Sequence, residues 1–244
     1  MSDSIHLSWP TFPEEFVIGE LLQTASEFQR FYREERKKIV GRIYWAQDST
    51  LPKGIDYRNT RIEAGEQIIQ VILLRRVPAS LEDAFKIAHE LEHLVLDTEG
   101  FPSTGVFNPC YESLSSALNS MVADLIVDQR LQKYGFDLRA DYEAEAAESL
   151  RQLERVPRPP AGRLDRTHWI FNYVAKVLYW ELLDTREEHC GFQAWFDGKF
   201  PDTASRAKKL LARVKRVGYD TPEKQKRLFQ EIIRRYKLER ILRV

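Results

Sequence analysis

This chain has few cysteines, no long apolar run and no secretion signal. These features argue against a cysteine-based zinc module, a membrane-spanning protein and a secreted protein, respectively. Its two cysteines, Cys110 and Cys190, belong to no C-x-x-C pair, which suits a reducing compartment and argues against a zinc module built from cysteines. No apolar stretch approaches the roughly 20 residues that a membrane-spanning helix needs. The segment Met1–Ser4 lacks the basic and apolar regions of a secretory signal. We therefore expect a cytoplasmic protein with no membrane partner.

The chain also has no net charge, since 37 basic residues balance 37 acidic ones, but the charges are unevenly distributed. Residues 81–154 carry 15 acidic and 5 basic side chains, whereas residues 201–244 carry 14 basic and 5 acidic ones. A basic C-terminal region could hold nucleic acid. Its apolar residues recur at helical spacing, however, and no glycine-rich loop or known nucleic-acid motif accompanies them. We expect the basic side chains to form the solvated faces of packed helices, so nucleic acid is not the favoured partner.

The most informative stretch that is present is the H-E-x-x-H motif at residues 89–93. An α-helix brings positions four apart onto one face, so His89 and His93 can direct imidazole nitrogens at one zinc ion, with Glu90 beside it. The motif therefore predicts two metal ligands and a base, provided that the segment is helical.

The residues around the motif predict such a helix. Ser80 is a favourable N-cap, and Asp83 stands three residues later as its capping-box partner. Apolar residues then recur at helical spacing, and Gly100 supplies the usual stop. We expect a capped amphipathic helix that carries the motif.

The sequence A-H-E-L-E-H-L at residues 88–94 resembles the active-site helix of zincin metallopeptidases. One branch, the metzincins, continues H-x-x-G-x-x-H, but here Leu96 stands at the glycine position and Glu99 at the last histidine position. The chain is more similar to the gluzincins, which place a carboxylate ligand on a following helix, usually as E-x-x-x-D. The resemblance covers roughly Ser80 to Tyr134 and implies a second helix that supplies the remaining zinc ligand.

A helical pattern over about residues 113–134 offers Asp124 and Asp128 at that spacing, about thirty residues beyond the motif. On a helical wheel, Asp128 falls within the apolar stripe and Asp124 lies at its margin. Carboxylates are seldom buried unless they are paired or bound to a metal. Both aspartates are therefore expected to have a partner.

The resemblance implies that Asp124 is the third zinc ligand and that Asp128 orients His89 or His93 by hydrogen bonding. Aspartate stands where the family most often has glutamate, and its shorter side chain requires a closer approach to the metal. Asp128 or Glu112 therefore stays open as an alternative third ligand.

The function that the resemblance implies is a zinc-dependent intracellular peptidase that hydrolyses peptide bonds in a peptide or protein substrate. Glu90 is the expected general base, accepting a proton from a water whose pKa zinc lowers to about 7. An oxyanion donor is also needed, and Tyr142, His168 and Tyr173 are candidates by residue type, although packing is the ordinary role of such residues. The alternative is a non-catalytic zincin-fold protein with a regulatory or nucleic-acid-associated role.

The remaining periodicity predicts an α+β fold in which a small sheet packs on the motif helix and on the second ligand-bearing helix, followed by a mainly helical C-terminal region. We expect residues 67–74 to form an edge strand that can pair with an extended peptide. The expected helices cover residues 14–40, 164–184, 204–217 and 222–242, and the expected strands cover residues 42–47, 57–63 and 67–76, with the last two as a hairpin.

Prolines interrupt the helical pattern between residues 155 and 162 and predict a boundary there. The expected organisation is a zincin-like metallopeptidase domain at residues 1–155, a proline-rich connection at residues 156–163 and a helical, basic region at residues 164–244.

Overall fold

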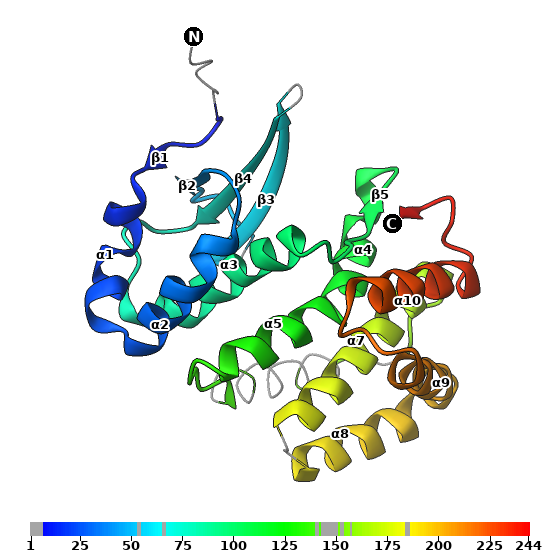
Figure 1. Cartoon of the computed structure of the whole chain (residues 1–244). Coiled ribbons are helices and arrows are strands. Elements are labelled where there is room, and N and C mark those ends of the chain that lie inside the picture. Colours follow the sequence, from blue (N-terminus) through cyan, green and yellow to red (C-terminus); the bar gives the residue numbers. More distant parts are fainter. Residues whose placement is uncertain are drawn as a thin grey trace. The chain divides into compact units, whose positions relative to one another are not determined.

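The computed structural model describes residues 7–52, 55–64, 67–139, 142, 151, 154–156, 158–183 and 186–244. Within these residues the chain is a mixed α+β protein in which helices predominate (Figure 1), which confirms the α+β part of the predicted fold class. Contacts divide the chain into two compact units, Met1–Glu99 with Arg130–Phe136, and Gly100–Gln129 with Asp137–Val244. The predicted boundary at residues 156–163 stays a prediction.

The first unit contains a four-stranded sheet with the strand order β1-β2-β4-β3. Strand β4 pairs antiparallel with β3, as the hairpin prediction requires, and parallel with β2. The prediction of an edge strand at residues 67–74 is wrong, because β4 lies inside the sheet and β3 forms the edge. Residues 71–74 of β4 are all buried, and a continuous apolar run of this kind is typical of a strand covered on both faces. The strands are β1 (Thr11–Phe12), β2 (Ile43–Gln47), β3 (Tyr57–Ala64) and β4 (Gln67–Leu74).

The helix expected over residues 14–40 is divided into α1 (Glu14–Thr24) and α2 (Ser26–Glu35), followed by a 3-10 turn. The single-helix prediction is wrong because Ala25 is extended, with φ −95° and ψ 99°. The break lets α1 pack against both α2 and β2, so that each helix buries its own apolar side chains. Gly41 ends the segment as predicted, with φ at 94°.

Helix α3 (Ala84–Thr98) carries the H-E-x-x-H motif and packs against β3 and α2 (Figure 1). The predicted capping box is confirmed: the Ser80 main-chain N–H donates to Asp83 Oδ2 at 2.7 Å, and the Ser80 side chain accepts from the Asp83 main chain. Gly100 follows the helix with φ at 83°, a left-handed conformation that favours glycine. The motif therefore lies on a helix whose start and end were both predicted from the sequence.

The second helix expected from the sequence, over residues 113–134, is also divided, into α4 (Glu112–Ser120) and α5 (Ala123–Gln132). The continuous-helix prediction is wrong at Met121 and Val122, which form a turn. Both side chains are fully buried, and the helix is interrupted because the Val122 main-chain N–H donates to the carbonyl of Asn119, three residues earlier, at 3.2 Å. Helix α5 contributes residues to both compact units.

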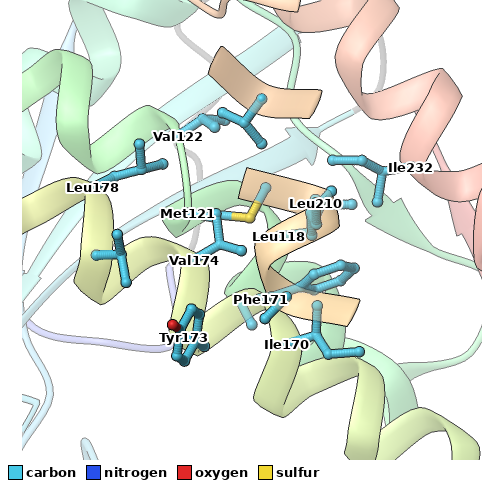
Figure 2. Packing of buried hydrophobic residues seen from close by; sticks show 14 of the residues in the cluster. Leu118, Met121, Val122, Ile170, Phe171, Tyr173, Val174, Leu178, Leu210 and Ile232 are labelled. Carbon is cyan, nitrogen blue, oxygen red and sulfur yellow. The ribbon is translucent and has the colours of Figure 1, made fainter. Parts of the chain in front are cut away.

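The second unit has a core of helices. Side chains from α4 and its following turn interdigitate with α7, and Leu210 of α9 and Ile232 of α10 reach the same cluster (Figure 2). The long α7 packs against α4, α8 and α9, so it lies at the centre of this core. The helices are α7 (Arg163–Leu183), α8 (Arg186–Lys199), α9 (Pro201–Val217) and α10 (Pro222–Arg235).

The basic C-terminal region consists of packed helices, as the sequence predicts. Its apolar stripe faces the core, with Leu210, Val214, Leu228, Phe229, Ile232 and Ile233 all buried. Several of its cations pair with acids of the same unit, among them Lys215 with Glu181 and Arg227 with Glu231. Part of the positive charge is thus neutralised locally.

Helix α10 is shorter than predicted. It ends at Arg235 rather than continuing to Leu242, and Lys237 adopts a positive φ of 55°. The turn brings Leu238 back into the core and lets β6 (Leu242–Arg243) pair antiparallel with β5 (Gly105–Val106). Among the described residues, none of the helices combines the length and the apolar composition needed to cross a membrane.

Candidate metal centre

Two histidines on one face of α3 form the starting point of the site. His93 Nε2 lies 3.1 Å from His89 Nε2, and the two rings meet edge to face with their centroids 4.8 Å apart. Two ligand atoms on a tetrahedral zinc ion, at bond lengths of about 2.0–2.1 Å, are separated by about 3.4 Å. The two imidazoles are therefore already spaced as ligands of one ion.

Asp124 completes a group of three that could hold a metal. One ligand atom from each of His89, His93 and Asp124 lies within 4.8 Å of the other two, and all three side chains are half-buried. Neither Asp128 nor Glu112 belongs to this group, which is the one found in the described part of the chain. Two imidazole nitrogens and a carboxylate oxygen form a ligand set that zinc accepts, although the donor types do not exclude other divalent transition metals.

Glu90, the expected base, is anchored by the edge strand β3. Its Oε2 accepts a hydrogen bond from the Asn59 main-chain N–H at 2.8 Å and another from Asn59 Nδ2 at 2.5 Å. Both bonds end on the same oxygen. This partner could not be predicted, because strand and helix residues 31 positions apart meet only when β3 packs on α3.

Asn59 is the middle one of three β3 residues that interact with residues in or next to α3. Tyr57 hydrogen-bonds Asp83 just before the helix, and burial together with that bond raises the pKa of the tyrosine. Arg61 attracts Asp97 in the last turns of α3. The odd-numbered residues of the strand thus face helix positions seven apart. Because side chains alternate along a strand, Tyr57, Asn59 and Arg61 all lie on the same face of β3.

Asp128 is fully buried on α5 and has the partner that its burial predicted. The Tyr142 hydroxyl donates a short hydrogen bond to Asp128 Oδ2. Tyr142 stacks on Tyr179 with ring centroids 4.7 Å apart, and burial together with the charge of Asp128 raises the pKa of Tyr142 well above its usual range. In this conformation the Tyr142 hydroxyl is directed at Asp128, so it is not a free donor for an oxyanion.

The other two candidate oxyanion donors lie in helix α7. Tyr173 is 1% exposed and packs in an aromatic cluster, with its ring centroid 4.9 Å from that of Phe196. His168 Nδ1 lies 3.3 Å from Asn172 Nδ2, and burial lowers the pKa of this histidine. Packing explains the position of Tyr173, and neither residue belongs to the metal-binding group.

A buried ion pair anchors the end of α5 to α3. Glu92, inside the motif, is 0% exposed, and its Oε1 accepts from Arg130 Nη1 at 3.0 Å. The other guanidinium nitrogen of Arg130 donates to Glu99 at 2.7 Å. Burial raises the pKa of Glu92 to about 7, although the hydrogen bond from Arg130 opposes this shift. Arg130 therefore pairs with two carboxylates of α3 through one guanidinium group.

The raised pKa of Glu92 predicts a pH-dependent stability. Between its ordinary value of 4.5 and about 7, the folded chain binds a proton at Glu92 that the unfolded chain has released. Stability from this group is therefore greatest below pH 4.5 and falls as the pH rises to about 7. Relative to Glu92→Gln, the wild-type free energy of unfolding should fall by about 3 kcal/mol across this window.

Urea unfolding of both proteins at several pH values measures this difference, in which the contributions of all other groups largely cancel. Parallel curves for wild type and Glu92→Gln would contradict a buried carboxyl that titrates near neutrality.

Comparison of the chain with protein families, with curated proteins and with solved structures found no match. The similarity to gluzincins at the motif is therefore a prediction from the sequence.

Proposed function

We propose that this chain is a zincin-type zinc peptidase that hydrolyses peptide bonds. The single observation that carries the proposal is the group formed by His89, His93 and Asp124, with Glu90 one residue from the first ligand on the same helix. Metal-assisted hydrolysis requires ligands that hold the ion and a base next to it. The two imidazoles would serve as ligands, and the carboxylate of Glu90 would serve as the base.

In this proposal the two histidines bind through Nε2 and Asp124 binds through a carboxylate oxygen. When bound, zinc would polarise the scissile carbonyl and lower the pKa of a water to about 7. Glu90 accepts a proton from that water and delivers it to the departing amine nitrogen. Its two hydrogen bonds with Asn59 both use Oε2, which leaves Oε1 as the oxygen for proton transfer.

Asp128 has the supporting role in the proposal, as the carboxylate that orients a ligand histidine. Such partners fix the ring and raise its basicity, and their loss typically weakens metal binding about 10- to 100-fold. Tyr142 would in turn hold Asp128 through its short hydrogen bond. Tyr142 would therefore support the metal site indirectly, by holding the carboxylate of Asp128.

Zinc measurement on three matched carboxylate variants tests the ligand assignment. Purified wild-type chain is expected to bind about one zinc ion, and Asp124→Asn to lose affinity by more than the 10- to 100-fold expected for Asp128→Asn. Glu112→Gln should bind as wild type, because Glu112 is exposed and lies outside the metal-binding group. Circular dichroism checks that each variant is folded.

Incubation with a mixed peptide library tests the activity itself. Cleavage should stop when a chelator removes zinc and should return when zinc is restored. A chain that binds zinc and cleaves no peptide would reject the peptidase proposal, while a chain that binds no zinc would reject the metal site as well.

A further inference from the structure

A double hydrogen bond joins Asn59 of strand β3 to Glu90, the proposed base. Two donors of one residue, the main-chain N–H and the side-chain amide, converge on Glu90 Oε2 at 2.8 Å and 2.5 Å. Asn59 is half-buried on β3, and Glu90 is half-buried on α3. A hydrogen bond to an ionised group is stronger than one between neutral groups, so this contact restrains both residues.

The main-chain donor comes from the free edge of the sheet. Among the described residues, strand β3 pairs on one side only, with β4, where Asn59 stands opposite Ile72. In an antiparallel pair, alternate residues direct their N–H groups toward the partner strand and away from it. Since the Asn59 N–H reaches Glu90, it is one of the outward-directed groups, and the sheet loses no hydrogen bond by donating it.

Two donors on one oxygen also fix the rotation of the carboxylate. A single bond would allow the group to turn about its last torsion, which is broad for glutamate. Two bonds from different directions hold Oε2 toward β3 and thereby direct Oε1 away from the strand. Catalytic groups must be held close to their productive geometry, and a misplacement of about 1 Å can cost about 100-fold in rate.

We propose that Asn59 is the positioning residue for Glu90, holding Oε2 so that Oε1 is presented for proton transfer. The inference rests on the proposed function, because it assigns Glu90 the role of base. Asn59 itself touches no reacting atom in this scheme. It acts on the rate of the chemical step and leaves the binding of the peptide unchanged.

Kinetic analysis of Asn59→Ala and Asn59→Asp, on a reporter peptide taken from the cleaved members of the library, tests the proposal. The alanine variant loses the side-chain donor and keeps the main-chain one, so kcat should fall about tenfold or more while KM stays within about twofold. The aspartate variant has the same shape, cannot donate and repels Glu90, so its kcat should fall at least as far. Zinc content should match wild type in both.

Thr60→Ala is the matched control, because its side chain lies on the opposite face of the strand from Asn59 and its kcat should equal that of wild type. Equal kcat values for wild type, Asn59→Ala and Asn59→Asp would overturn the positioning role. So would a rise in KM alone, since that would make Asn59 a substrate contact.

A double-variant cycle separates this inference from the proposed function. Unfolding equilibria of Asn59→Ala, Glu90→Ala and the double variant should show an interaction of about tenfold, as expected for a hydrogen bond to a charged group. A wild-type chain that cleaves nothing would reject the peptidase and the kinetic role of Asn59 together. If wild type cleaves peptides and the cycle shows no interaction, only the positioning role fails.

Discussion

Glu90→Gln should lower kcat by about 100- to 10,000-fold and leave zinc content unchanged. General acid–base catalysis by a positioned side chain typically contributes a factor of this size. Glutamine keeps the shape of glutamate and offers Asn59 an acceptor oxygen, but it cannot take a proton from water at neutral pH. Peptide cleavage under saturating substrate, with zinc measured on the same sample, separates loss of the base from loss of the metal.

Glu82→Gln provides the control for this experiment. Glu82 is exposed in the 3-10 turn that precedes α3, and it carries the same substitution on the same segment of chain. Its activity should equal that of wild type. A zinc-loaded Glu90→Gln variant with undiminished kcat would remove Glu90 from the mechanism, and with it the case for a hydrolase of this type.

Arg130→Met should destabilise the chain by about 3–5 kcal/mol at pH 8, because it leaves Glu92 buried without its counter-charge. Glu92 is 0% exposed, so its carboxylate has no solvent contact in the native fold to compensate for the lost guanidinium. The loss should be smaller at pH 5, where Glu92 is already protonated in the folded chain. Urea unfolding of wild type and variant at both pH values measures the two differences.

Lys133→Met is the matched control for the lost charge, since Lys133 is exposed in the turn that follows α5. Its effect should stay within about 0.5 kcal/mol, as for most surface substitutions. The double variant Glu92→Met with Arg130→Met should recover much of the loss, because a buried pair can often be replaced by apolar groups of similar volume. Equal destabilisation by Arg130→Met at both pH values would show that the effect comes from packing.

The parts of the site that could be predicted from the sequence are those set by local geometry. His89 and His93 are four positions apart, and any helix places such residues on one face. The capping box at Ser80 and the stop at Gly100 involve residues close in sequence, so the helix limits could also be predicted. The burial of Asp128 followed from its position in an apolar pattern, even though the predicted continuous helix is broken before it.

The parts that were missed depend on contacts between distant residues. An apolar run marks β4 as a strand, but its place in the middle of the sheet depends on which neighbours pair with it. The sequence around Asn59 does not indicate its contact with Glu90, which forms only because β3 packs on α3. The sequence around Glu92 likewise does not indicate burial or its ion pair with Arg130 of α5. The turn at Met121 and Val122 contains no glycine or proline, so the sequence does not predict it.

Local sequence patterns predicted the α+β character, the helix that carries His89, Glu90 and His93, and the carboxylates available as a third ligand. Each of these follows from residue type and from helical or alternating spacing, which act over a few neighbouring positions. Only the folded chain shows the possible metal-binding group of Asp124 with the two histidines, the hydrogen bonds from Asn59 to Glu90 and the ion pair of Arg130 with Glu92. These contacts require side chains from separate elements to meet, and that depends on how the elements pack.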